Sequence, residues 1–374
     1  MEESKHGAIP RVANGLGTAS PDAQLPKGFA DNLDLLWCTG CNGDLEVIRD
    51  GLRCLGCGHR FARDGRIPLL FWPNEGRPDN DVTEIVKSFY EENPFPNYDG
   101  HDSADTLREK ARRGLYAQLL DDQIPPYAKV LEVGCGTGQL SNFLACCSTR
   151  TIFGADMCLN SLRLGDNFRH ANSLDNLGFC QMNLFKPVFR TGAFDVVICS
   201  GVLHHTSDPF GGFKSISRLV KPGGIIMIGL YNTYGRALTD FRRFLFNTFG
   251  EGLTFIDSRL RDKSVDEARR RTWFMDQYKH PHESKHTYGE VLRWFEGNGF
   301  RFLNSVPKSR GGRLTLNERL FEPHSRGSRL DRFMVQSSMV IKGAREGGLF
   351  IMIGRRQPSE EKKWDGKFTS SASG

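Results

Sequence analysis

The stretch that decides the fold is KVLEVGCGTGQL, residues 129–140. Its first five residues form an apolar run typical of a buried strand, and a helical pattern follows over 139–147. Between the two, Gly134, Gly136 and Gly138 alternate with other residues. Glycine permits a sharp turn and a close approach of the backbone to a ligand, and the free N–H groups of a helix N-terminus favour an anionic group. The stretch therefore predicts a ligand-binding turn at the start of an α/β unit.

Apolar runs and helical patterns alternate downstream of this turn. Strands are expected at 129–133, 151–155, 178–182, 194–199, 224–230, 300–305 and 349–353. Helices are expected at 139–147, 160–170, 211–220 and 288–298. Near-continuous apolar strands that are each followed by a helix favour a parallel sheet covered on both faces. We therefore predict an α/β fold with a doubly wound, mostly parallel seven-stranded sheet whose last strand runs antiparallel.

Length and composition limit the class of protein. The chain has 374 residues, of which 39% are hydrophobic and 25% are charged, and its formal net charge is +6. These values exclude a single small module and a wholly disordered chain. No apolar run approaches the ~18 residues of a membrane span, and the N-terminus lacks the apolar core of a signal peptide. We expect a cytoplasmic protein with no membrane span, and the composition leaves its oligomeric state open.

An acidic residue follows the second strand of the predicted sheet. Asp156 lies 18 residues after Gly138, where a carboxylate can accept both hydroxyls of a ribose. The glycine spacing is G-x-G-x-G, whereas the dinucleotide fingerprint is G-x-G-x-x-G. The loop and the acid together indicate a nucleoside ligand rather than a pyrophosphate. The alternative is a tight turn with an ordinary helix cap.

Five stretches between residues 126 and 231 resemble the motifs of class I S-adenosylmethionine-dependent methyltransferases, especially the group that includes the ubiquinone and menaquinone biosynthesis enzymes. They are VLEVGCGTGQL, GADMC, GFCQMNLFKPVF, FDVVICSGVLHHTSDP and RLVKPGGIIMIG. The resemblance implies the class I methyltransferase fold, methyl transfer as the reaction and S-adenosylmethionine as the cofactor.

The same resemblance implies which residues hold the cofactor. The glycines would cradle its methionine part, Glu132 would orient the ammonium group, Asp156 would bind ribose and Met157 would lie against adenine. Related enzymes usually carry Asp at the position of Asn183, whose amide adds a donor that needs a partner. The implied cofactor-binding residues are Glu132, Gly134, Cys135, Gly136, Thr137, Gly138, Asp156, Met157, Asn183, Leu184, Ser200 and Leu203.

Three residues at the carboxyl ends of the fourth and fifth strands are candidates for the chemistry: His204, His205 and Tyr231. An imidazole at this edge could deprotonate a hydroxyl or an amine, or the histidine pair could only shape the loop. Tyr231 could line an acceptor pocket or pack against the sheet. Residues 88–96, SFYEENPFP, resemble a stretch upstream of other methyltransferase domains. We hypothesise that they form a lid over the cofactor, with interdomain packing as the alternative.

Four cysteines near the N-terminus form two C-x-x-C pairs, Cys38 with Cys41 and Cys54 with Cys57. Two such pairs separated by a short segment are typical of a tetrahedral zinc site. Four thiolates leave no open position, so we predict a structural Zn²⁺. The surrounding module resembles the zinc-ribbon family that includes the activating partner subunit of tRNA and translation-factor methyltransferases, and similar ribbons precede rRNA guanine and deoxysugar methyltransferases.

The predicted domains follow from these segments. We expect a disordered tail over 1–30, a small β-rich zinc ribbon over 31–73, and a linker with covering helices over 74–125, including one amphipathic helix over 107–120. The methyltransferase domain covers 126–356, with insertions at 232–286 and 306–346, and a second disordered tail covers 357–374. The first insertion could be a lid, a packed helical pair or an RNA-contacting surface.

The second insertion is basic. Between residues 307 and 345 there are nine Lys or Arg and three acidic residues, which predicts a flexible basic arm. The leading functional prediction is methyl transfer to a small organic acceptor of the sugar or secondary-metabolite type. One alternative is an RNA methyltransferase that uses the ribbon and Arg310, Arg313, Arg326 and Arg329. The other is a non-catalytic cofactor-binding scaffold.

Overall fold

A seven-stranded sheet forms the centre of the molecule. The computed structural model describes residues 24–358 apart from 75–80, 96–97, 99–102, 250–255, 263–266 and 343–346. The strand order is β10-β11-β9-β8-β5-β6-β7. The five strands from β9 to β7 run parallel to one another, and β11 is antiparallel to both β9 and β10. The predicted doubly wound, mostly parallel sheet is confirmed, including its antiparallel last strand.

The strands of this sheet agree with the predicted ranges to within a few residues. They are β5 Lys129–Val133, β6 Thr151–Asp156, β7 Leu177–Gln181, β8 Phe194–Ser200, β9 Val220–Tyr231, β10 Phe300–Val306 and β11 Leu349–Arg356. The helices that cover it are α3 Ala104–Arg112, α4 Leu115–Gln123, α5 Gln139–Ala145, α6 Leu159–Ala171, α7 Pro209–Ser217 and α11 Tyr288–Gly297. A short 3-10 helix, η2, covers Leu203–His205.

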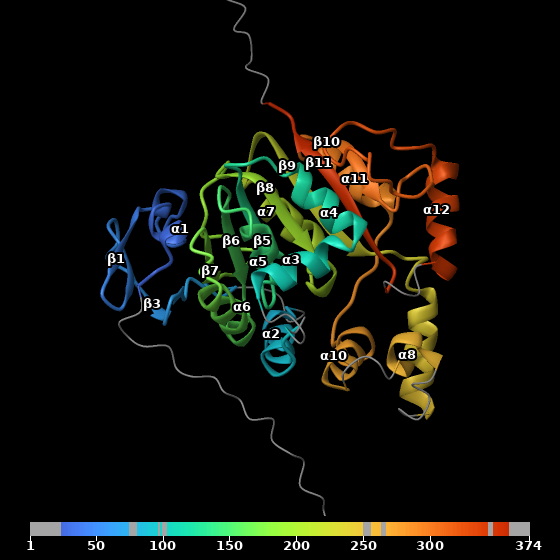
Figure 1. The fold of residues 1–374 in the computed structure, drawn as a ribbon, viewed down its shortest axis with the longest axis horizontal. Helices are drawn as coiled ribbons and strands as arrows, with labels where there is room; N and C mark the ends of the chain where they lie inside the picture. The colour runs from blue at the N-terminus through green and yellow to red at the C-terminus, as the bar shows by residue number, and fades with distance from the viewer. Residues whose placement is uncertain are drawn as a thin grey trace, which may run out of the picture.

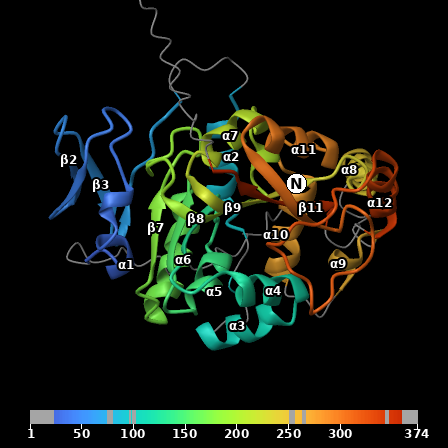
Figure 2. The ribbon, with the colours of Figure 1, turned by 90° about the horizontal axis from the view of Figure 1, so that it is seen from above.

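Helices cover both faces of the sheet. In the view from above, α7 and α11 lie on one side and α3, α4 and α5 lie on the other (Figure 2). The first apolar core joins inward side chains such as Val197 to Phe213 of α7 and Phe295 of α11. The second joins Val196, which points to the opposite face, to helix residues such as Phe143 of α5. This two-sided burial explains why the parallel strands are apolar throughout.

A small four-stranded sheet lies at one end of the molecule, at the blue side of Figure 1. Its antiparallel strands are β1 Leu45–Ile48, β2 Gly51–Cys54, β3 Arg60–Asp64 and β4 Ile67–Pro68. It is joined to the large sheet, because Leu70 N–H donates to the carbonyl of Gln181 at the end of β7 (3.0 Å). The expected β-rich module over 31–73 is present in this form, preceded by a 3-10 helix, η1 Leu33–Leu35.

The expectation of a disordered tail over 1–30 is wrong for its last residues. Helix α1, Lys27–Ala30, packs on β6 and β7. Phe29 is fully buried, and its ring lies 5.6 Å from that of Phe153. Gly178 makes this possible, since a Cβ there would lie 2.6 Å from the Cβ of Phe29. Residues 1–23 and 359–374 of the two expected tails lie outside the described residues.

The predicted single helix over 107–120 is also wrong. The helix is interrupted at Gly114, and the two shorter helices, α3 and α4, pack against each other. Arg112 of α3 bonds to Asp121 of α4 (2.7 Å), whose carboxylate also accepts from the buried Arg150 (2.9 Å). The two arginines satisfy a buried carboxylate that a continuous helix would leave without these partners.

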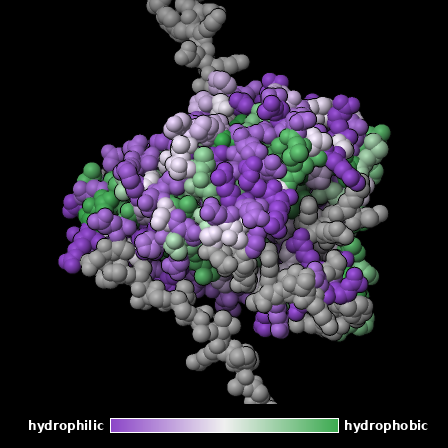
Figure 3. All heavy atoms as spheres, viewed as in Figure 1, coloured by the Kyte–Doolittle hydropathy of each residue, from purple (hydrophilic) through white to green (hydrophobic). Residues whose placement is uncertain are grey.

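Both insertions contain helices, which lie at the end of the molecule opposite the small sheet (Figure 1). The first holds α8 Ala237–Phe249, α9 Ser258–Arg261 and α10 Glu267–Tyr278, and the second holds α12 Arg329–Lys342. The expectation of a flexible arm over 307–345 is wrong in its described part, because α12 is helical, Lys308 pairs with the buried Glu318 (2.6 Å) and Ser309 is buried. Exposed apolar side chains gather over α8 and α12 (Figure 3), among them Phe241, Phe244, Phe249, Leu330, Phe333 and Met334.

Within the described residues, no helix is both long enough and apolar enough to cross a bilayer.

Replacing Phe29 with alanine tests whether α1 belongs to the fold. Because Phe29 is fully buried, we expect Phe29→Ala to lower the free energy of unfolding by about 3–5 kcal/mol. The matched control is Phe244→Ala on the exposed face of α8, with an expected change below about 0.5 kcal/mol. Urea unfolding followed by circular dichroism measures both. Equal midpoints for Phe29→Ala and the wild type would contradict the placement of α1.

Candidate functional site

The glycine loop between β5 and α5 adopts left-handed backbone at each glycine. The φ angles of Gly134, Gly136 and Gly138 are +70°, +53° and +70°, a region that disfavours side chains. Neighbours also approach closely, since a Cβ on Gly136 would lie 2.4 Å from the carbonyl oxygen of Phe95. The pattern G-x-G-x-G is therefore required both by the turn and by the segment that closes over it.

Two carboxylates flank the loop. Asp156 accepts from the N–H of Gly136 and the N–H of Cys158, each at 2.8 Å. Burial raises the pKa of Asp156 above its usual range, although the two N–H donors lower it in part. Glu132 accepts from the hydroxyl of Ser141 at 2.5 Å, and burial raises its pKa to about 8. The loop therefore lies between two acids that would ionise more readily beside a cationic ligand.

A cavity of about 330 Å³ opens at the carboxyl ends of β5, β6, β8 and β9. This is the edge at which open α/β sheets bind ligands. The predicted site residues that line it are Glu132, Gly134, Cys135, Gly136, Asp156, Met157, Asn183, Leu184, Ser200, His205 and Tyr231. The structure thus brings most of the predicted cofactor and catalytic residues around one space.

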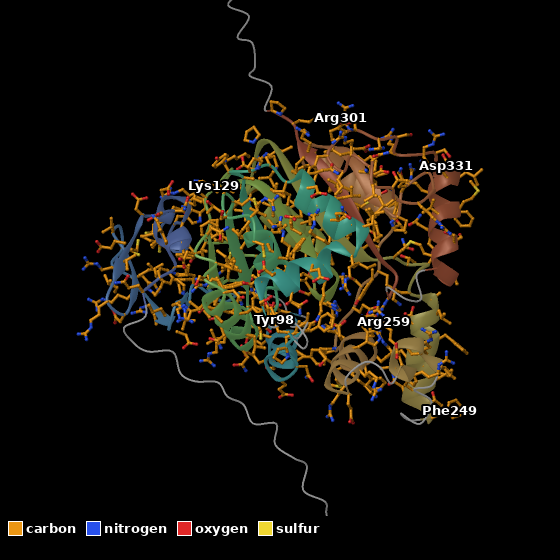
Figure 4. The ribbon with its side chains drawn as sticks, viewed as in Figure 1. Tyr98, Lys129, Phe249, Arg259, Arg301 and Asp331 are labelled. Atoms are coloured by element: carbon orange, nitrogen blue, oxygen red, sulfur yellow. The ribbon has the colours of Figure 1, made fainter. Side chains whose placement is uncertain are left out.

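Four predicted site residues are not among those lining the cavity. Thr137 is buried, and its carbonyl accepts a hydrogen bond at 2.8 Å from the hydroxyl of Tyr98, which is labelled in Figure 4. Gly138 packs on the ring of Phe179, and Leu203 is fully buried. The remaining one is His204, whose buried ring lies 4.0 Å from that of Tyr231. These four support the loops behind the cavity wall.

The side-chain NH₂ of Asn183, a donor that an aspartate would lack, has two hydrogen-bond acceptors. Its Nδ2 donates to the carbonyl of Trp72 and to Oδ1 of Asn74, both at 2.8 Å. Its Oδ1 accepts from the N–H of Phe185 at 3.0 Å. Trp72 and Asn74 lie a few residues after β4, the last strand of the small sheet, so an amide at position 183 ties that module to the cavity. An aspartate there would oppose two acceptor oxygens.

His205 has a defined tautomer. Its Nδ1 lies 2.8 Å from the carbonyl oxygen of His282, so Nδ1 carries the proton and Nε2 carries the lone pair. Burial lowers the pKa of His205 to about 4. Its ring stacks on that of His280 at 3.6 Å. The imidazole is therefore neutral near pH 7 and offers Nε2 as an acceptor.

Helix α2, Thr83–Glu92, covers one side of the cavity. Glu91 fixes it, because its two carboxylate oxygens accept the N–H groups of Leu159 and Asn160 at the start of α6 (2.8 and 3.0 Å). Tyr90 and Phe95 of the hypothesised lid line the cavity. Pro96, the last residue of that hypothesis, lies outside the described residues.

The first insertion contributes cavity residues that no sequence motif predicted. Trp273, Asp276 and Gln277 of α10 line the cavity. Asp276 Oδ1 accepts the hydroxyl of Tyr90 at 2.9 Å across 186 residues of sequence. The only local signal is a polar pair, Asp276 and Gln277, within an otherwise apolar and aromatic stretch, WFMDQY.

The four cysteines of the small sheet converge. Their sulfurs all lie within 4.8 Å of one another, with Cys38 and Cys57 at 3.8 Å. A tetrahedral zinc with bonds of about 2.3 Å has sulfurs separated by about 3.8 Å. Gly43 leaves room for this cluster, because a Cβ there would lie 2.9 Å from the sulfur of Cys54. The N–H of Cys57 lowers the pKa of Cys54 to about 6. The donor set fits a closed tetrahedral Zn²⁺.

The strand order, the left-handed glycine loop and the acid at the end of β6 define a class I methyltransferase fold. Residues 131–228 match the family described as Methyltransferase domain. The chain therefore contains a methyltransferase domain of this class, as the motif resemblance implied.

Individual proteins are similar to parts of this chain. A Synechococcus protein without a described function is 28% identical over 264 residues, 62% of each chain. A ubiquinone biosynthesis O-methyltransferase from Coxiella burnetii is 28% identical over 190 residues, 50% of this chain and 70% of that enzyme. The structure of PKMT2 from Rickettsia typhi in complex with AdoHcy matches 62% of this chain and 49% of that chain, with 15% identity and a TM-score of 0.44. The chain spans about three fifths of the length of the Synechococcus relative.

Metal analysis of the purified chain tests the cysteine cluster. We expect about one zinc per chain in the wild type and loss of most of it in Cys54→Ser, which removes one of four ligands. Cys147→Ser, outside the cluster, is the matched control and should retain the metal. Wild-type protein purified without chelator that contains no zinc would contradict this prediction.

Substitution of Asn183 by aspartate tests the tie between the two sheets. The carboxylate would lose two donated hydrogen bonds and face two oxygens, so we expect a loss of about 2–4 kcal/mol in the free energy of unfolding. The loss in the free energy of unfolding should be smaller at a pH below the pKa of the new carboxyl group, because the protonated carboxyl donates one hydrogen bond. Urea titrations at two pH values measure this, with the exposed Asn317→Asp as control. Equal losses in the two variants would refute the assigned partners.

Proposed function

We propose that this chain is an S-adenosylmethionine-dependent methyltransferase that acts on a small organic molecule. The observation that carries the proposal is the single cavity that joins the glycine loop and Asp156 to the aromatic residues of α2 and α10. One half suits a nucleoside cofactor and the other suits an acceptor. A pocket of a few hundred Å³ is typical of a small-molecule site.

The residues of the first half fit the cofactor. Asp156 lies at the carboxyl end of β6 with oxygens for two ribose hydroxyls, and Met157 would lie against adenine. Glu132 beside the loop would orient the ammonium group. The side-chain NH₂ of Asn183 already donates to the segment that follows the small sheet. Its oxygen accepts one hydrogen bond and keeps one lone pair, which could accept from the adenine amine.

Bound S-adenosylmethionine would supply a methyl group already activated on a sulfonium. The chain then needs to align the acceptor, exclude water and take up a proton. His205 is suited to a hydrogen-bonding or proton-accepting role through Nε2, because its other nitrogen is held by the carbonyl of His282. Tyr231 lines the same cavity. His204 supports these two rings from behind.

A small acceptor has more support than RNA. The aromatic half of the cavity is formed by Tyr90, Tyr231 and Trp273, and the Coxiella relative is named for ubiquinone biosynthesis. The four arginines of the RNA alternative are exposed, and none of them lines the cavity. They are Arg310, Arg313, Arg326 and Arg329. In this proposal the zinc is structural, since it holds the module that contacts Asn183.

Binding of S-adenosylmethionine at a series of pH values tests the cofactor half. A proton and a cationic ligand compete for Glu132, whose pKa in the free protein is about 8. Affinity should therefore rise from pH 6 to pH 7.5, by up to about tenfold per unit, with release of a proton. Asp156 also has a raised pKa, so its ionisation should likewise increase the affinity as pH rises.

Titration calorimetry measures both the affinity and the proton release. Glu132→Gln should flatten the pH dependence to the part contributed by Asp156, while Asp156→Asn should weaken binding by about ten- to a hundredfold. Absence of binding by the wild type would contradict the proposed methyl transfer and favour a non-catalytic scaffold. An affinity that falls as pH rises would contradict the role of Glu132.

A further inference from the structure

Asp276 is a buried carboxylate in the acceptor half of the cavity. It lies in the last turn of α10, is 5% exposed and lines the cavity. Its Oδ1 accepts from the hydroxyl of Tyr90 at 2.9 Å, and its Oδ2 accepts from Nε2 of Gln277 at 2.8 Å. Both partners are neutral donors. Each oxygen therefore still has a lone pair for a further donor.

The orientation of Gln277 is fixed, so Asp276 acts as an acceptor on both sides. Oε1 of Gln277 accepts from Arg236 at 2.6 Å, which leaves Nε2 as the group that faces Asp276 and the hydroxyl of Tyr231 (2.8 Å). Arg236 is fully buried and pairs with Glu283, whose carboxylate also accepts from Arg243 at 2.8 Å. Both oxygens of Asp276 thus accept hydrogen bonds. Among the described residues, Asp276 forms no ion pair.

The rings around Asp276 are held from outside the cavity. The guanidinium of Arg236 lies 3.8 Å from the ring centre of Tyr231. That of Arg259, labelled in Figure 4, lies 4.1 Å from the ring centre of Trp273. A buried acid within supported aromatic walls is a costly arrangement for packing alone, because a buried carboxylate normally has a cationic partner.

We propose that Asp276 is the catalytic residue that binds the reacting group of the acceptor, and that this group is a hydroxyl or amine on an uncharged or cationic molecule. The inference rests on the proposed function and names its substrate class. Asp276, Asp156 and Glu132 line one cavity. Asp156 and Glu132 are assigned to the cofactor, so Asp276 is the acidic group left in the acceptor half; its carboxylate disfavours a negative charge on the acceptor and favours a donor or a cation.

The reaction at this site balances without another reagent. The bond between the acceptor heteroatom and its hydrogen breaks, and the proton passes to the carboxylate of Asp276. The heteroatom forms its bond to the methyl carbon as the bond from that carbon to sulfur breaks, and the electron pair of that bond stays on sulfur. Tyr90 and Gln277 hold the carboxylate in place by donating to its two oxygens.

The experiment uses the full chain, S-adenosylmethionine with a labelled methyl group and the small-molecule fraction of a cell extract. Products are separated on anion and cation exchangers, and S-adenosylhomocysteine binding is measured on each variant as the control for folding. The matched control is Asp257→Asn. Asp257 is also buried and accepts a tyrosine hydroxyl, that of Tyr278 at 2.5 Å, but it does not line the cavity.

We expect label in products that the anion exchanger does not retain. Asp276→Asn should reduce the rate of label transfer at least about a hundredfold. Its affinity for S-adenosylhomocysteine should stay within about threefold of that of the wild type. Asp257→Asn should keep transfer, and Asp276→Glu should transfer more than Asp276→Asn because it restores the carboxylate. Near-normal transfer by Asp276→Asn, or label only in anionic products, would overturn the inference and leave the proposed methyl transfer intact. Failure of the wild type to bind S-adenosylhomocysteine would overturn the proposed function itself.

Discussion

The left-handed backbone of the glycine loop is the constraint on which the rest of the site depends. At Gly134, Gly136 and Gly138 a side chain would be strained by the backbone angle and would collide with a neighbour. The neighbours come from different parts of the chain, namely Val202 after β8, Phe95 after α2 and Phe179 in β7. Because the loop has no side chains at these points, three segments close on it and the N–H of Gly136 reaches Asp156.

The small cysteine sheet is part of the construction of the cavity. The segment that leaves it pairs with the end of β7, and Asn183 then donates to Trp72 and Asn74. The ring of Trp72 lies 5.2 Å from that of His59, two residues after Cys57. The geometry of the four sulfurs is thus linked through a short chain of contacts to one wall of the cavity. An asparagine at position 183 follows from this link, since only an amide can donate to both oxygens while it accepts from Phe185.

The first insertion completes the cavity. Its helices pack around a small apolar core of Phe246, Phe274 and Tyr278. The buried pair of Arg236 and Glu283 then joins the end of β9 to the segment after α10. A fully buried ion pair contributes less to stability than to a defined geometry, because desolvation offsets much of its attraction. Here it orients Gln277, and through Gln277 it orients Asp276.

Local sequence determined the strands of the large sheet and the glycine loop. Strand and helix periods, the G-x-G-x-G turn, the acid at the end of β6 and the two C-x-x-C pairs are short-range patterns that the sequence displays directly. What local patterns could not give are contacts between distant segments. The burial of Phe29 depends on the absence of a side chain at Gly178, and the break at Gly114 places Asp121 next to Arg150. Tyr90 and Asp276 meet only because α2 and α10 close over the same edge of the sheet. Periodicity and turn chemistry act over a few residues, whereas the partners of a buried polar group are set by how the whole chain packs. The sequence alone therefore located the glycine-loop side of the cavity, and the tertiary structure decided the side that α2 and α10 form.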